Sequence, residues 1–235
     1  DELVNAILED RDGDIWFATN NGLNLYSPST NTWKHLFEWN PTNPETLKNC
    51  IFLSLHETDE GHIIAGGFMT GVYSINKKTL EATLLTPHSY KQNSNPNFAN
   101  NYIRVIYQDS EGLTWTGGNY YLGCVDAKNQ TFKNYFIGSV ITCLLEKDST
   151  TLLIGTGDGM YSMNKKTKEI NKMRMPFASG HINTMYMHPN GDLYIGTTNS
   201  GLVILHQNGE HHIYRMQNSA LLSNTINDII PKNEN

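Results

Sequence analysis

An internal repeat is the feature that most restricts the folds open to this chain. The residues GVYSINKKTLE at 71–81 return as GMYSMNKKTKE at 159–169, identical at eight of eleven positions and 88 residues further along. Half of that distance suggests a period of about 44 residues. Periods of 20–50 residues are typical of solenoids, propellers and other repeat arrays. The fold is therefore expected to be built from similar units.

A second anchor, the residue that follows a turn of the Asp-Gly type, shows how many copies are present. Five anchors are separated by 48, 51, 38 and 41 residues: Trp16, Ile64, Trp115, Leu153 and Tyr194. The residues twelve positions before them are all apolar: Val4, Phe52, Ile103, Ile141 and Ile182. The residues nine positions before them are apolar too: Ile7, Leu55, Ile106, Leu144 and Met185. Ile226 and Ile229 occupy the same two columns of a sixth copy.

Small residues form a third column, two positions after the anchor. Its members are Ala18, Gly66, Gly117, Gly155 and Gly196. A glycine inside a strand often marks a place where another segment approaches closely. This column therefore predicts a strand that packs tightly against its neighbour.

Each copy contains four short segments rich in β-branched and aromatic residues, separated by Gly, Asn, Asp and Pro, as strands and hairpins require. In the first copy they are residues 4–9, 15–19, 23–27 and 33–36. Four strands per repeat of about 40–50 residues are typical of a β-propeller blade. We predict an all-β chain, residues 1–235, forming a single propeller fragment of five four-stranded blades plus the first strand of a sixth. The blades are expected at residues 1–37, 48–86, 100–137, 138–174 and 180–215, with the partial sixth at 222–235.

The first copy also resembles a known repeat family. Residues 4–26 read VNAILEDRDGDIWFATNNGLNLY, which is similar to the two-component regulator propeller repeat. The sequence LSNTINDI at 222–229 is similar to the opening of that repeat. Later copies depart from the pattern, because Ile64, Leu153 and Tyr194 replace the tryptophan, and Thr150 and Tyr121 replace turn glycines.

The resemblance implies a function and a location. Such repeats form the extracytoplasmic sensor of hybrid two-component systems, most often in gut Bacteroidetes, which recognise polysaccharide breakdown products and signal to a histidine kinase. It therefore implies a periplasmic domain that binds an oligosaccharide, in a membrane-anchored parent chain that forms a homodimer. Sensors of this kind carry more than five blades, so the chain is expected to be part of a larger propeller sensor.

Charge and composition weigh against several other classes of protein. The net charge is −6 and the lysines are scattered, so no basic stripe for nucleic acid is present. Three cysteines cannot form a disulfide framework.

His206, His211 and His212 could ligate zinc, copper or nickel. Because residues 207–210 between them are typical of a surface hairpin turn, we expect no metal site, and no cofactor motif is present.

Two alternatives to a sensor stay open. A glycosidase needs two carboxylates flanking the scissile bond. Glu38, Glu45 and Asp158 are the acids expected on the face that carries the longer loops, and they form no obvious pair, which weighs against a glycosidase.

The enzyme alternative is a propeller lyase of the streptogramin-opening type, whose repeats have a similar Asp-Gly-x-x-Trp turn. The other is a protein–protein interaction platform. We expect the domain itself not to be an enzyme.

Loop lengths indicate where a ligand would bind. The connections at 37–51 and 86–102 are long, whereas that at 137–140 is short, and long loops on a rigid scaffold often carry binding residues. Aromatic faces can stack on sugar rings, and Asp, Asn and Arg can bond sugar hydroxyls. The expected contacts are Trp39, Phe68, Arg104, Tyr120, Tyr121, Asp158 and Asn199. Alternatively, Trp39 and Tyr90 only hold their own loops in place.

Overall fold

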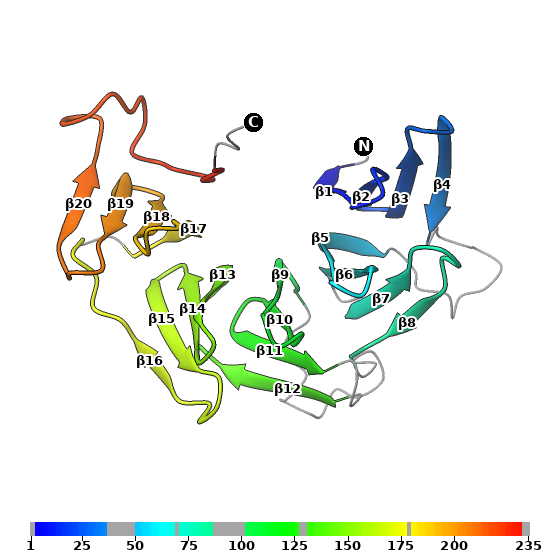
Figure 1. Cartoon of the computed structure of the whole chain (residues 1–235), viewed down its shortest axis with the longest axis horizontal. Coiled ribbons are helices and arrows are strands. Elements are labelled where there is room, and N and C mark those ends of the chain that lie inside the picture. The colour runs from blue at the N-terminus through cyan, green and yellow to red at the C-terminus, as the bar shows by residue number, and fades with distance from the viewer. Residues whose placement is uncertain are drawn as a thin grey trace. The chain divides into compact units, whose positions relative to one another are not determined.

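The chain folds into five antiparallel sheets of four strands each, and each sheet is a meander of consecutive strands. A computed structural model describes residues 3–36, 50–68, 71–86, 102–126, 131–177 and 180–231. The described residues contain no helix. Figure 1 shows the consecutive strands of each sheet side by side. The predicted all-β class and four-stranded blades are therefore confirmed.

The strands divide between two compact units, residues 1–136 and 137–235. The first unit contains three blades: β1 (Val4–Glu9), β2 (Ile15–Thr19), β3 (Gly22–Ser27) and β4 (Thr32–Leu36); β5 (Ile51–Glu57), β6 (His62–Phe68), β7 (Val72–Asn76) and β8 (Ala82–Leu84); β9 (Val105–Gln108), β10 (Thr114–Gly117), β11 (Tyr121–Asp126) and β12 (Thr131–Phe136). The second unit contains two blades: β13 (Ile141–Asp148), β14 (Thr151–Thr156), β15 (Gly159–Asn164) and β16 (Ile170–Lys172); β17 (Ile182–Met187), β18 (Leu193–Thr197), β19 (Leu202–Leu205) and β20 (His211–Tyr214).

The column of small residues is where successive blades meet. A Cβ atom added to Gly66 in β6 would lie 2.8 Å from Cβ of Ile103, at the start of the next blade. One added to Gly155 in β14 would lie 2.9 Å from Cγ2 of Ile182. The apolar residue twelve positions before an anchor therefore packs on the small residue of the preceding blade, as a column of Gly and Ala allows.

A β-bulge near the start of the first strand adds a hydrogen bond to this contact. The register of β1, β13 and β17 shifts around Asn5, Thr142 and Asn183. The side chain of Asn5 donates to the carbonyl oxygen of Phe52 (2.8 Å), and that of Thr142 to Ile182 (2.5 Å). Each bulge thus joins its blade to the backbone of the next, in keeping with the use of bulges to redirect a side chain.

The predicted first strand of a sixth blade is placed on the fifth blade in the same way. Ile226 donates its N–H to the carbonyl of Thr197 (2.9 Å), and Asn183 donates to the carbonyl of Ile226 (3.0 Å). Residues 225–230 form no β-ladder with other described residues. The segment therefore lies on the fifth blade as predicted but does not form a β-strand. The described part of the chain contains no second strand with which it could pair.

The tryptophan anchors are fully buried and fix the turn between the first two strands. Trp16 donates its indole N–H to Asp10 (2.9 Å), whose other carboxylate oxygen accepts the N–H groups of Asp12 and Asp14. Trp115 makes the same bond to Asp109 (2.8 Å). A carboxylate six positions before the tryptophan thus serves both the core and the turn, satisfying groups that would be costly to bury unpaired.

An ionic cluster, which we call the lysine clasp, joins the first blade to the second. Lys77 Nζ lies 2.7 Å from a carboxylate oxygen of Asp12, 2.6 Å from Glu57 and 3.5 Å from Asp10. Burial alone would lower the pKa of Lys77, but the hydrogen bonds to Asp12 and Glu57 outweigh it and raise that pKa. The clasp connects the turn after β1 with β5 and the end of β7.

Candidate ligand-binding surface

Two of the predicted contact residues meet in the first unit through a tyrosine. Phe68, at the end of β6, forms an isolated β-bridge with Tyr102, and their rings contact edge to face at 5.1 Å. The guanidinium of Arg104 lies over the Tyr102 ring, 4.3 Å from its centroid. Phe68 is 38% exposed and Arg104 is exposed. We call Phe68, Tyr102 and Arg104 the aromatic–arginine cluster.

Sequence reasoning missed Tyr102. The available signal was its position directly before the buried Ile103, at the end of a long predicted loop. The described residues offer Arg104 no ion-pair partner, so its side-chain N–H groups remain able to donate. The cluster thus presents an aromatic surface beside a cation that forms no ion pair with the described residues, a combination that can stack on and bond a polar ring.

Tyr120 and Tyr121 lie in the same unit at the start of β11, and their roles differ. Tyr120 is 53% exposed. Tyr121 pairs with Phe136 across β11 and β12, with ring centroids 5.3 Å apart. No ring contact between described residues joins either tyrosine to the aromatic–arginine cluster. The Tyr120 ring is thus available to stack on a ligand, whereas part of the Tyr121 ring contacts Phe136.

Asp158 and Asn199 belong to the second unit, in the β14–β15 and β18–β19 turns. Asp158 accepts hydrogen bonds from Thr156 (2.7 Å), Tyr161 (3.1 Å) and Lys172 (2.7 Å). Burial alone would raise its pKa, but these bonds, the largest from Lys172, lower the pKa to about 2. Asp158 therefore stays ionised with its oxygens already engaged, whereas Asn199 is exposed.

Several predicted features lie outside the described residues. Trp39 and Tyr90 are among them, so the structure does not place these two aromatic rings. Glu38 and Glu45, the acids expected on the same face as Asp158, are among them too. The remaining predicted contacts divide between the two units, and within the first unit Phe68 and Arg104 are brought together through Tyr102.

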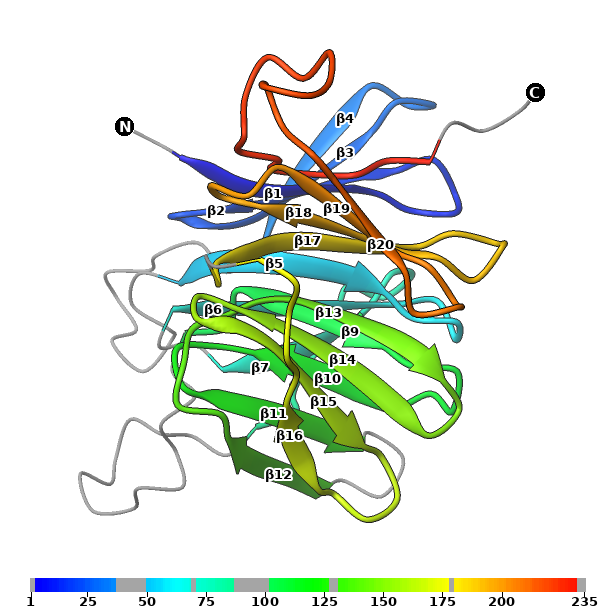
Figure 2. The same ribbon diagram turned by 90° about the vertical axis from the view of Figure 1, so that its left-hand side faces the viewer.

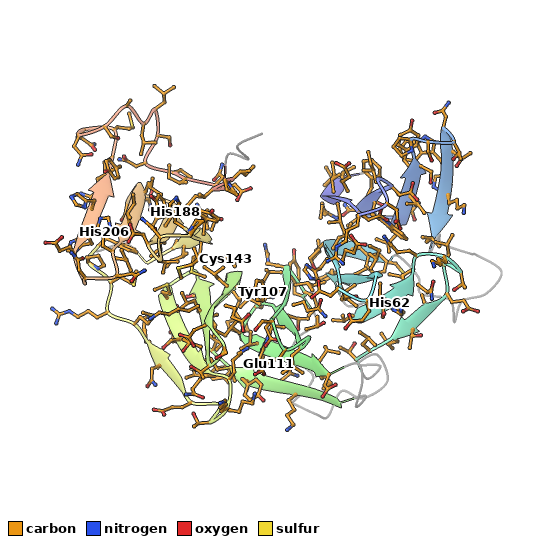
Figure 3. All side chains as sticks on the ribbon, viewed as in Figure 1. His62, Tyr107, Glu111, Cys143, His188 and His206 are labelled. Carbon is orange, nitrogen blue, oxygen red and sulfur yellow. The ribbon has the colours of Figure 1, made fainter. Side chains whose placement is uncertain are left out.

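The three histidines weighed as metal ligands lie on the fifth blade. His206 Nε2 and His212 Nδ1 are 2.9 Å apart, and His206 Nδ1 is 2.8 Å from Asp192. Figure 3 shows His206 on this blade, together with His188. Within the described ranges, no group of three His, Cys, Asp or Glu residues is placed to hold a metal ion. His206 and His212 thus bond each other instead of converging with His211.

Cys50 and Cys143 are not activated thiols. Burial raises the pKa of Cys50 to about 12, and it does the same for Cys143 in spite of hydrogen bonds from Thr142 and Gly155. A nucleophilic cysteine needs a lowered pKa.

No helix among the described residues is long and apolar enough to cross a membrane.

Residues 1–21 match the model of the two-component regulator propeller family, so the chain carries a repeat of that family. No curated protein sequence matches the chain. Among solved structures, the chain is similar to the extracellular domain of BT3049 from B. thetaiotaomicron, assigned to a hybrid two-component system. The TM-score is 0.76 at 18% identity, over 97% of this chain and 30% of that one.

Two further structures share the fold. The extracellular domain of BT4673, assigned to a hybrid two-component system of the same organism, matches with a TM-score of 0.66 and 21% identity, over 94% of this chain and 31% of that one. Virginiamycin B lyase from Staphylococcus aureus, solved with quinupristin, matches with a TM-score of 0.68 and 16% identity, over 91% of this chain and 70% of that one. The chain therefore spans about a third of the length of the two extracellular domains. At these identities the likeness establishes the propeller fold.

Proposed function

We propose that this chain is part of the extracytoplasmic sensor of a hybrid two-component system, located in the periplasm, and is itself not an enzyme. The family repeat at residues 1–21 supports this proposal, as does the fold shared with two extracellular domains assigned to such systems. In this proposal the parent chain is anchored in the membrane, forms a homodimer and passes the signal to a histidine kinase.

The proposed ligand is an oligosaccharide, and the aromatic–arginine cluster is the observation that carries this part. The exposed Phe68 edge and the Tyr102 ring offer apolar surface for a sugar ring. The Arg104 guanidinium, without an ion-pair partner among the described residues, can donate to sugar hydroxyls. Tyr120, in the same unit as the cluster, is exposed enough to contribute. In the second unit Asn199 is exposed, and Asp158 would have to exchange one of its present bonds to contact a sugar. Trp39 and Tyr121 complete the proposed set.

Signalling would follow from a difference in affinity. A ligand shifts an equilibrium between two receptor arrangements only as far as it binds one of them more tightly. An oligosaccharide held by the cluster would therefore favour the dimer arrangement in which Phe68 and Arg104 are best placed to hold it.

Isothermal titration calorimetry of the full receptor against defined oligosaccharides tests the proposal. Phe68→Ala and Arg104→Gln should each weaken binding about tenfold, because each removes roughly 1.4 kcal/mol of contact. Tyr214→Ala, which removes an aromatic ring of matching exposure (39%) from β20, should leave binding unchanged. Equal losses in all three variants, or no oligosaccharide binding, would contradict the proposal.

A lyase is the second candidate, because the chain shares its fold with virginiamycin B lyase. Product analysis distinguishes a lyase from a sensor that only binds its ligand. Mass spectrometry should detect no cleavage of a bound oligosaccharide or of a streptogramin lactone. Turnover of either compound would establish the enzyme in place of the sensor, and binding of a protein alone would favour the interaction platform.

A further inference from the structure

The second unit contains a cavity that the proposed oligosaccharide surface does not use. Its volume is about 1080 Å³, which is the size of a small-molecule site. The cavity is bounded by the end of β13, by the turns after β17 and β19 and by the segment after β16. These turns lie at the opposite strand ends from Asp158 and Asn199. Figure 2 shows the segment after β16 running along the edge of this unit toward β17.

The floor of the cavity is apolar and rich in methionine. Met173, Met175 and Met187 line it, all partly buried and packed on the core that includes Leu153 and Leu193. Leu153 and Leu193 also line the cavity. Methionine side chains are flexible and polarisable, so they adapt to the shape of an apolar ligand. The floor therefore suits a hydrocarbon body.

The rim of the cavity carries two cationic side chains and three imidazoles. Lys147 and Arg174 are exposed on the rim, and neither forms an ion pair in the described ranges of the chain. Three imidazoles, those of His188, His206 and His211, line the same rim.

The two acids on the rim are held by their own turns. Asp148 accepts hydrogen bonds from the N–H (2.9 Å) and the hydroxyl (2.7 Å) of Thr150. Glu210 accepts one from the amide of Asn208 (2.9 Å). Carboxylates can only accept hydrogen bonds, so the charged groups on the rim that can donate to a ligand are Lys147 and Arg174, which are complementary to an anionic head group.

We propose that this cavity binds a small amphipathic carboxylate, with its hydrocarbon body on Met173, Met175 and Met187 and its carboxylate at Arg174 and Lys147. Burial of the hydrocarbon supplies most of the affinity, and the cations select the head group. The site is a second ligand site, independent of the aromatic–arginine cluster.

Decanoate, below its micelle-forming concentration, is the probe for a calorimetric titration of the full chain. It should bind, and octanoate should bind about tenfold more weakly, since each buried methylene contributes about 0.8 kcal/mol. Arg174→Gln and Lys147→Gln should each weaken decanoate binding about tenfold, because each removes a charge-assisted hydrogen bond. Both residues are exposed, so the variants should fold.

Two controls make the test decisive. Lys166→Gln removes the same charge from an exposed lysine of the β15–β16 turn and should leave decanoate binding unchanged. Decanol and decyltrimethylammonium, the neutral and cationic analogues, should bind at least tenfold more weakly than decanoate. The proposal is overturned if decanoate fails to bind, if decanol binds equally well, or if affinity does not change with chain length.

Discussion

The first strand of the first blade and the entry to the third blade carry equivalent apolar residues with opposite burial. Val4 in β1 is 53% exposed, whereas Ile103, in the same column, is 1% exposed. Ile7 is likewise exposed, while its equivalent Ile106 is buried. Ile103 is covered by the preceding blade, so an apolar side chain in this column contributes most to stability where a described neighbouring blade covers it.

The contacts of the two residues explain the difference. Ile103 packs on Gly66 of the second blade, and its carbonyl oxygen accepts a hydrogen bond from Ser54 (3.2 Å). No described residue provides the equivalent glycine or donor for Val4. The first blade is joined to the second by Asn5 and by the lysine clasp. The interface between the second and third blades thus uses apolar packing at Ile103, whereas the interface between the first and second blades adds an ionic connection.

The largest effect is expected where the close packing on the third blade is blocked. Gly66→Val would place side-chain atoms within contact distance of Ile103 and Ser54, and should lower the free energy of unfolding by more than about 4 kcal/mol. Urea denaturation followed by circular dichroism measures this. Adding Ile103→Ala should restore part of the loss, because it opens space for the valine. Strictly additive losses would show that the two blades do not touch at this point.

The lysine clasp should give the next largest effect. Lys77→Met leaves Asp10 and Glu57 buried without their cation, and should cost about 3 kcal/mol. The neighbouring variant Lys78→Met makes the same change at an exposed residue and should cost less than about 0.5 kcal/mol. Equal unfolding midpoints for the two variants would mean that the clasp does not hold the first blade.

A truncation at the two compared positions tests the comparison directly. Ile103→Ala should destabilise the chain by about 2 kcal/mol more than Val4→Ala, because only the first creates a cavity. The same denaturation assay compares the two variants. A loss at Val4 as large as that at Ile103 would indicate that β1 is covered in solution, for example by a second copy.

Acid should weaken the lysine clasp of the first blade. The hydrogen bond from Lys77 lowers the pKa of Asp12 below its ordinary value of 3.8. The stabilisation by Asp12 is therefore complete above about pH 4 and is lost as the pH falls through that lowered pKa. The indole N–H signal of Trp16, which donates to Asp10 of the clasp, can be followed by NMR. It should weaken as the pH falls below about 4, and a Trp16 signal that does not change with acid would contradict this prediction.

The sequence predicted part of the candidate ligand-binding surface. Phe68 and Arg104 were identified from their positions beside long loops, and the structure brings them together through Tyr102. Tyr102 itself was missed, because a bridge between two loop ends leaves no periodic pattern. The engagement of Asp158 by Lys172 was equally invisible, since the pair is formed by residues 14 positions apart whose side chains meet only after β15 and β16 pair.

The pattern of the sequence predicts the four-stranded blade. Its repeat, its apolar columns and its Gly and Asp turns require four antiparallel strands, because these patterns depend on local backbone preference and on burial within one repeat. Tertiary structure decided which equivalent residues are buried, as Val4 and Ile103 show. It also formed the cavity lined by Met175, Arg174 and His206. Both depend on contacts between blades, and such contacts join residues whose separation in the sequence carries no signal of their own.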